Sequence, residues 1–238
     1  MKPSLRYALH PLLPVRLGFR SLMKMVNPEL ARLLDLTDGY TLVSSRNRTS
    51  LYRKAKAVLE KGTPGDFVEI GVHRGGSAAV LAYLLKDHPD RTLHLFDRWG
   101  DLPEPTAKDG YRREQYARQN IPEKLAGLRD NAPLKATKTA IEQVVGYDRA
   151  VYYQGWYEDS LPTYSGRKIA FVSLDCDYYE SVKLALSFIR ANAAPGICIV
   201  NDDYDAWPGA KIATDEFVRE FGGTVRRTGL GPADIYLH

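Results

Sequence analysis

Short, continuous apolar runs along the chain alternate with longer segments in which apolar residues recur at helical spacing. The runs are rich in β-branched and aromatic residues and predict strands over residues 66–72, 91–97, 149–155, 167–175 and 196–203. Helices are predicted over residues 48–61, 137–145, 181–192 and 209–221, and residues 73–88 form a glycine turn that opens another helix. Because strands and helices alternate, the pattern predicts an α/β fold with a doubly wound sheet of largely parallel strands.

The two ends of the chain depart from this alternation. Residues 222–238 read as two strands around a Gly-Pro turn, which predicts a hairpin at one sheet edge. Near the start, Asn27 and Pro28 have the order of an N-cap and a first helical residue, so a short helix is predicted there. We therefore expect a helical arm over residues 1–45 and one large α/β domain over residues 46–238.

Between the second and third predicted strands the pattern breaks down. Prolines interrupt residues 98–136, and an insertion at this edge of a sheet often covers a site as a lid. A surface subdomain without a catalytic role is the alternative. The helix that follows is predicted to begin at a cap formed by Thr137.

Composition narrows the class of protein. The formal net charge is +4 with Lys and Arg scattered along the chain, which gives little reason to expect nucleic-acid binding. No apolar run approaches the roughly 18 residues that a membrane span needs. The two cysteines, Cys176 and Cys198, fall in or beside predicted buried strands, which favours a reducing, cytoplasmic location over a disulfide framework.

The first 25 residues are basic and partly apolar, with prolines that break any signal-peptide core. We interpret them as an ordered arm packed on its own domain. The alternative is contact with a membrane surface or with a partner subunit, in which case the arm would build a homodimer or a higher oligomer.

Three carboxylates follow the fourth and fifth predicted strands. Asp175 ends one strand, and Asp202 and Asp203 end the next, so parallel strands would deliver all three to one edge of the sheet. Carboxylates gathered in one crevice repel one another, and a hard cation such as Mg²⁺ or Ca²⁺ would relieve that repulsion. The alternative is helix capping, in which Asp175 or Asp177 begins the helix that follows.

The glycine turn after the first strand excludes two ligand classes. A dinucleotide-binding turn needs glycine where this chain has His73, and a phosphate loop needs lysine where it has Ser77. Asp97, just over 20 residues beyond the turn, stands where a nucleotide-binding unit holds ribose hydroxyls. The remaining ligand has a ribose and, at the helix N-terminus, a group smaller than a diphosphate, such as a carboxylate.

S-adenosylmethionine fits that description. Glu69 adds an acid in the first strand that would orient the amino group of the methionyl part, or would instead be a buried acid paired with a neighbouring Arg or hydroxyl. The residues assigned to this donor from the turn and the first two strands are Glu69, Gly71, Gly75, Ser77 and Asp97.

Five ordered blocks carry a more specific resemblance. GDFVEIGVHRGGS, QGWYEDSLP, LDCDYYES, NDDY and PGAKIATDEF, in this order, resemble the macrocin O-methyltransferase family, Mg²⁺-dependent enzymes that methylate sugar hydroxyls on antibiotics. The match runs from about Tyr40 to the C-terminus. It implies a Rossmann-like class I methyltransferase fold with a seven-stranded sheet, S-adenosylmethionine as methyl donor and Mg²⁺ as cofactor.

The resemblance also implies roles for residues. Asp175, Asp202 and Asp203 become the metal ligands, and Asp175 doubles as general base, while Asp177 is left as a cap or a supporting residue. Gly155 and Trp156 follow the third strand, where enzymes of this class commonly contact adenine; a core aromatic is the alternative for Trp156.

Another family segment, which folds over the donor, resembles Thr41 to Ser44. The chain departs from the family pattern at His73 and in the RWGDLPEP run after Asp97. These departures affect the identity of the acceptor more than that of the donor.

The function expected from these residues is Mg²⁺-dependent O-methylation of a small-molecule acceptor, a sugar or a glycosylated natural product. A catechol-type O-methyltransferase acting on a phenolic vicinal diol is the first alternative. The Asp175-Cys176-Asp177 run also has the DxD pattern of nucleotide-sugar transferases, and a non-catalytic scaffold is the non-enzymatic alternative.

Overall fold

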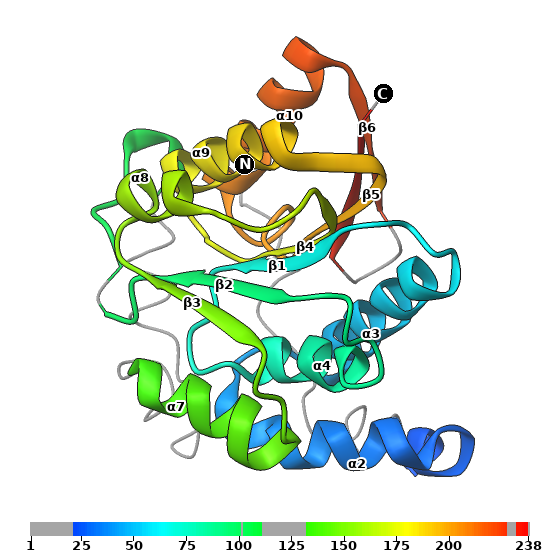
Figure 1. Cartoon of the computed structure of the whole chain (residues 1–238). Helices are drawn as coiled ribbons and strands as arrows, with labels where there is room; N and C mark the ends of the chain where they lie inside the picture. The colour runs from blue at the N-terminus through cyan, green and yellow to red at the C-terminus, as the bar shows by residue number, and fades with distance from the viewer. Residues whose placement is uncertain (1–20, 101, 111–131, 228–231, 238) are drawn as a thin grey trace, which may run out of the picture.

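The computed structural model of the chain describes residues 21–100, 102–110, 132–227 and 232–237. A seven-stranded sheet with the order β3-β2-β1-β4-β5-β7-β6 forms its centre (Figure 1). The strands are β1 (Asp66–Ile70), β2 (Leu93–Asp97), β3 (Ala150–Gln154), β4 (Ile169–Leu174), β5 (Ala193–Asn201), β6 (Gly223–Arg227) and β7 (Ala233–Leu237). Strands β1 to β5 pair in parallel, and β7 pairs antiparallel to both β5 and β6. The doubly wound sheet and the C-terminal hairpin predicted from the sequence are therefore confirmed.

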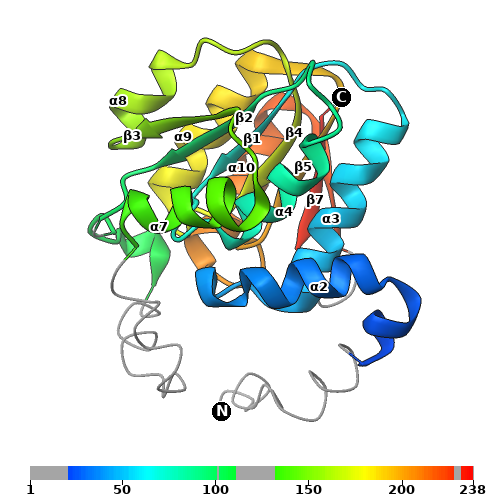
Figure 2. The ribbon, with the colours of Figure 1, turned by 60° about the horizontal axis from the view of Figure 1, so that its bottom comes forward.

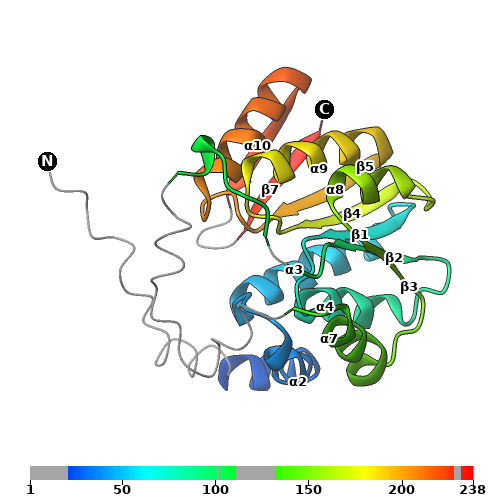
Figure 3. The same cartoon turned by 90° about the vertical axis from the view of Figure 1, so that its left-hand side faces the viewer.

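Helices cover both faces of the sheet, as Figures 1 and 3 show. One face carries α2 (Pro28–Thr37), α3 (Ser45–Glu60), α4 (Gly76–Leu85), α7 (Leu134–Lys138) and a π-helix (Thr139–Val145). The other carries α8 (Tyr157–Ser160), α9 (Tyr179–Asn192) and α10 (Pro208–Phe221). Short 3-10 helices lie at Asp38–Tyr40, Ala107–Asp109 and Leu161–Thr163. The apolar core is accordingly divided by the sheet into two clusters.

Local chemistry explains where most helices begin. The side chain of Asn27 accepts a hydrogen bond from Leu30 N (3.0 Å) and caps α2 at Pro28, as predicted. Helix α3 begins at Ser45, three residues before the predicted start, because Ser44 caps it by accepting from Asn47 N (3.1 Å).

The cap predicted at Thr137 is wrong. Helix α7 begins at Leu134 after Pro133, and Thr137 lies fully buried in its last turn. Its hydroxyl is engaged by residues far away in sequence, described below, and so cannot serve its own helix.

Part of the predicted lid lies outside the described residues, at positions 111–131. The described part reaches α9: Asp109, 1 % exposed, accepts a hydrogen bond from Tyr179 N at 2.6 Å. The first turn of α9 is therefore capped by a residue 70 positions earlier.

The N-terminal segment contributes to the core where it is described, while residues 1–20 of the predicted arm lie outside. Leu30, Leu33 and Leu34 of α2 are buried in the same apolar cluster as α3 and α4. Figure 2 shows α2 lying across these two helices. Among the helices that the structure describes, none combines the length and the apolar character needed to cross a membrane.

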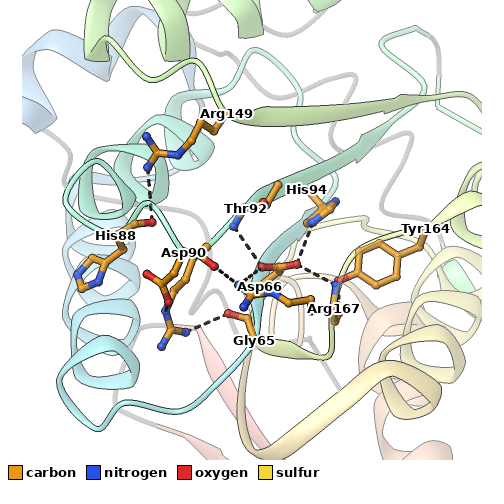
Figure 4. A network of polar contacts seen from close by, with 10 residues as sticks. Gly65, Asp66, His88, Asp90, Thr92, His94, Arg149, Tyr164 and Arg167 are labelled. Carbon is orange, nitrogen blue, oxygen red and sulfur yellow. Dashed lines mark hydrogen bonds and ion pairs between the residues drawn. The ribbon is translucent and has the colours of Figure 1, made fainter.

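Opposite the carboxyl ends of the strands, a network of polar contacts around the buried carboxylate of Asp66 fixes the start of β1 (Figure 4). The carboxylate of Asp66 accepts from Arg167 Nη2 and Arg167 N (both 2.9 Å) and from Thr92 N (3.2 Å), and His94 Nε2 lies 3.4 Å away. These hydrogen bonds lower the pKa of Asp66 against the opposing effect of burial, which is the largest single contribution. The network ties three loops together at the amino edge of the sheet, on the side away from the candidate site.

Candidate active site

Three predicted site residues, Gly71, Asp175 and Asp202, lie side by side at the carboxyl ends of β1, β4 and β5. Asp175 N donates to Ile70 O and Asp202 N donates to Leu174 O, both at 2.9 Å, so each residue directly continues the ladder of its strand. A Cβ at Gly71 would stand 1.8 Å from the carbonyl oxygen of Asp175, and Gly71 has a φ of 87°. Glycine is required there because the backbone of β4 passes too close for any side chain.

A group of three carboxylates, one buried and two partly buried, forms just beyond these strand ends. Asp175, Asp177 and Asp203 each offer an oxygen, and these atoms lie within 4.8 Å of one another. Asp203 Oδ2 also accepts from Asp177 N at 2.9 Å, and Asp177 has a left-handed backbone with a φ of 61°. An all-oxygen, all-acidic set of this size has the donors that a hard divalent cation requires.

Burial raises the pKa of all three carboxyl groups, and their mutual repulsion raises it further. For Asp175 the neighbouring charges are those of Asp203 and Asp202. Carboxylates crowded in this way are stabilised when a cation or a proton neutralises them. The residues present therefore fit a divalent metal ion.

The alternative interpretation of these acids as helix caps is wrong. The N-cap of α9 is Tyr178, which makes no side-chain capping hydrogen bond, and the N–H of Tyr179 goes to Asp109 instead. Neither Asp175 nor Asp177 caps that helix, and the carboxylate of Asp177 is hydrogen-bonded to the side chain of Trp207 instead.

Asp202 lies apart from this group of three. Its Oδ1 accepts from the side-chain amide of Asn47 at 2.8 Å, and it lines a small cavity together with Asp175, Asn47 and Ser77. Burial raises the pKa of Asp202, while the hydrogen bond from Asn47 opposes that rise. The assignment of Asp202 as a metal ligand stays a prediction, and the third member of the acidic group beside Asp175 and Asp203 is Asp177.

Asp97 is held by the two turns that follow β1 and β2. Its Oδ2 accepts from Val72 N and His73 N (both 2.7 Å), and its Oδ1 accepts from Trp99 N (2.6 Å). These three backbone donors fix the orientation of the carboxylate. Because a carboxylate has about four acceptor positions, one remains for a ligand hydroxyl.

The start of α4 is covered by the segment that precedes α3. A Cβ at Gly76 would stand 2.5 Å from Thr41 Cβ and 2.8 Å from Tyr40 O. Arg48, 1 % exposed, anchors this segment by donating to Val43 O and Leu34 O, both at 3.2 Å. The helix N-terminus therefore lies beneath residues 40–44.

Glu69 is fully buried beside the same helix start. Its Oε1 accepts from Ser173 Oγ at 3.2 Å, whereas its Oε2 has no hydrogen-bond partner among the described residues. Burial raises its pKa to about 8, although hydrogen bonds from Ser77 and Ser173 oppose the rise. The alternative of a buried acid paired with a hydroxyl therefore describes one of its two oxygens.

At the end of β3, Trp156 is 39 % exposed, which excludes the core aromatic considered as its alternative. The guanidinium of Arg98 lies 4.0 Å from the centroid of its ring. Gly155 N donates to Asp97 O at 3.1 Å, which joins this corner to the end of β2. The predicted adenine-side residues thus stand beside the predicted ribose ligand.

Sequence reasoning missed several residues of the site. Burial raises the pKa of Tyr157, and the negative charges of Asp97 and the acidic group raise it further. Asn47 and Arg48 carry no motif, because their partners come from distant parts of the chain. Asp177 was interpreted from the sequence as a cap or a supporting residue, not as a metal ligand.

The model of the macrocin-O-methyltransferase (TylF) family matches residues 35–224. Demethyldecarbamoylnovobiocin O-methyltransferase of Streptomyces niveus is 27 % identical over 77 % of this chain and 70 % of its own length. A tetracenomycin-C 4'-O-methyltransferase of Streptomyces olivaceus, named for an 8-(2,3-dimethoxy-alpha-L-rhamnosyl) substrate, is 30 % identical over 70 % of this chain and 63 % of its own. The solved O-methyltransferase NovP superposes with a TM-score of 0.70, at 22 % identity, over 84 % of this chain and 82 % of its own.

Proposed function

The chain belongs to the macrocin O-methyltransferase family, and on that premise we propose that it methylates a hydroxyl of a sugar carried by a natural product. It is an S-adenosylmethionine-dependent O-methyltransferase, as its relatives are named O-methyltransferases. The observation that carries the proposal is the adjacency of a turn-held Asp97 and a buried acidic group at one sheet edge. The relatives' names favour a glycosylated acceptor over a simple catechol.

The donor site is proposed to run along the ends of β1, β2 and β3. Asp97 meets the ribose, and Gly155 and Trp156 flank the adenine. The methionyl part lies at the start of α4, where Gly71, Gly75 and Ser77 line the turn. Glu69 faces the amino group there. Its Oε2, which has no hydrogen-bond partner among the described residues, supports this role, because a hydrogen bond from the amino group would stabilise this buried oxygen.

Mg²⁺ is the cofactor that these carboxylate oxygens fit. Asp175, Asp202 and Asp203 would hold it, and Asp177, which stands in the same acidic group, is a further candidate ligand. When bound, the ion supplies Lewis acidity that favours the deprotonated form of an acceptor hydroxyl.

Asp175 is proposed to accept the proton of the acceptor hydroxyl. Its pKa is raised by burial and by neighbouring carboxylates, which makes it a stronger base than an exposed aspartate. Asp177 is a second candidate base, since its carboxyl group stands in the same cluster.

The remaining assignments concern the cell and the assembly. A cytoplasmic location is supported by two free cysteines, Cys176 and Cys198, which a reducing compartment maintains. The division into an arm (residues 1–45) and a methyltransferase domain (residues 46–238) is retained, with the arm as the site of any homo-oligomer.

The proposal is tested with purified protein, S-adenosylmethionine, Mg²⁺ and a panel of deoxysugar glycosides, aglycones and catechols, read by mass spectrometry. We expect a gain of one methylene unit in a glycoside, abolished by EDTA and restored by Mg²⁺. Methylation of catechols alone would favour the catechol-type alternative. A thermal shift with UDP-sugars but not with S-adenosylhomocysteine would favour a nucleotide-sugar transferase and overturn the proposal.

A further inference from the structure

Trp99 stands where the chain departs from the family pattern, and it is turned into the protein. Its ring is 7 % exposed and lies 6.2 Å from the ring of Tyr152, centroid to centroid. Its backbone is left-handed with a φ of 50°, a conformation that bulky residues seldom adopt. Such conformations persist only where the surrounding structure holds them.

The hydroxyl of Thr137 holds Trp99 in this conformation. Its Oγ1 accepts from Trp99 Nε1 at 2.8 Å and donates to the carbonyl of His73, also at 2.8 Å. His73 likewise has a positive φ, of 53°. The hydroxyl therefore joins the turn after β1 to the turn after β2, and each turn contains a strained residue.

Both turns also meet at Asp97. His73 N donates to one oxygen of its carboxylate and Trp99 N donates to the other. Thr137 thus completes a ring of hydrogen bonds that has the candidate ribose ligand as its opposite member. On its other side the threonine fills the space above Gly75, where an added Cβ would stand 2.9 Å from both Thr137 Cα and Thr137 Cγ2.

We propose that Thr137 is a positioning residue for the methyl donor, whose hydroxyl sets the two turns that aim Asp97 at the ribose of S-adenosylmethionine. This inference rests on the proposed function, because it takes Asp97 as a donor ligand. The anchor also accounts for Arg98: with Trp99 held inward, the preceding side chain lies over Trp156 on the adenine side. Thr137 itself touches no reacting atom.

The test compares two substitutions at this position with a matched control. Thr137→Val keeps the shape of the side chain and removes the hydroxyl, whereas Thr137→Ser keeps the hydroxyl. Thr139→Val is the control, because the Thr139 hydroxyl donates to Lys135 O within its own helical segment. Isothermal titration with S-adenosylhomocysteine measures the dissociation constant and, through the stoichiometry, the fraction of folded protein.

We expect Thr137→Val to raise the dissociation constant about tenfold or more, which corresponds to about 1.4 kcal/mol. Thr137→Ser should stay within about threefold of wild type, and Thr139→Val within about twofold. A purely structural role would lower the stoichiometry and leave the dissociation constant of the folded fraction unchanged. A Thr137→Val protein with the wild-type dissociation constant therefore overturns the inference, whatever its yield.

Trp99→Phe tests the same bridge from its other end. Since the Trp99 indole acts through the Thr137 hydroxyl, the double variant should lose little more affinity than Thr137→Val alone, and fully additive losses would contradict the inference. Wild-type protein that binds no S-adenosylhomocysteine would overturn the proposed function together with this inference. Wild-type binding with an unaffected Thr137→Val variant would overturn this inference alone.

Discussion

The side-chain amide of Asn47 donates to Oδ1 of Asp202 at 2.8 Å across 155 positions of sequence. Ser44 Oγ donates to Asn47 Oδ1 at 3.1 Å, which fixes the amide with its nitrogen toward the carboxylate. The first turn of α3 therefore supports the end of β5. The same turn carries Arg48, the anchor of the segment that covers α4.

Asn47→Leu should leave the partly buried carboxylate of Asp202 without this donor. Loss of a partner from a buried polar group costs roughly 1–3 kcal/mol, so the free energy of unfolding should fall by about that amount in the absence of divalent ions. Mn²⁺ titrated by calorimetry should also bind more weakly. Asn192→Ala is the control, because Asn192 donates to Phe188 O at the end of α9. Equal losses in the two variants would refute a specific role for Asn47.

Asp175→Asn and Asp177→Asn separate the two candidate bases. The variant that removes the base should lower kcat by about 10²- to 10⁴-fold, while the dissociation constant for S-adenosylhomocysteine stays within about threefold. Asp205→Asn serves as control, because Asp205 is exposed and pairs with Arg227. A parallel loss of donor binding in both variants would point to a structural role for this acidic group.

Glu69 makes stability depend on pH in a defined direction. Its pKa is raised to about 8 in the folded protein from an ordinary 4.5, so its stabilising contribution is complete below about pH 4.5 and is lost as pH rises toward 8. Glu69→Gln should abolish this loss. Urea unfolding at about pH 5 and about pH 8 should show the wild type losing stability relative to the variant, by up to about 1.4 kcal/mol per pH unit. Parallel pH profiles would contradict the assignment.

Asp66 predicts the opposite dependence at the other edge of the sheet. Its pKa is lowered in the folded protein, so its contribution is present above the unfolded value near 3.8 and is lost as pH falls. Asp66→Asn should therefore lower the free energy of unfolding by about 1.5–3 kcal/mol at neutral pH, and the difference from wild type should shrink in acid. Asp90→Asn is the control, because Asp90 is exposed and lies 3.9 Å from Arg91. A difference that persists unchanged at low pH would argue against this network of polar contacts.

The sequence predicted the sheet well because buried parallel strands leave a local signature. Each apolar run from residue 66 to residue 203 became a strand, and the strand ends carried Asp97 and Asp175 to one edge. The hairpin was equally legible from its Gly-Pro turn. Periodicity and turn chemistry are local, so they survive without any knowledge of tertiary contacts.

The residues that support the site could not be predicted from the sequence, because their contacts are not local. Thr137 was interpreted as a cap because capping is the commonest local use of a threonine before a helix, yet its hydroxyl serves Trp99 and His73. Asn47 and Asp109 likewise act on partners far away in sequence. Contacts of this kind depend on how elements pack, which no pattern along the chain reveals. Residues 101 and 111–131 of the lid predicted over residues 98–136 fall outside the described residues, so the lid stays a prediction.

Thr41 lies over Gly76, so a methyl donor bound at the start of α4, as proposed, would lie beneath residues 40–44. Entry of this donor and exit of S-adenosylhomocysteine would then require residues 40–44 to move away from α4, against the anchor of buried Arg48. Such opening steps limit turnover in many enzymes. A burst of methylated product in the first turnover, followed by a slower steady state, would indicate that a step after methyl transfer, such as the opening of residues 40–44, limits the rate of turnover.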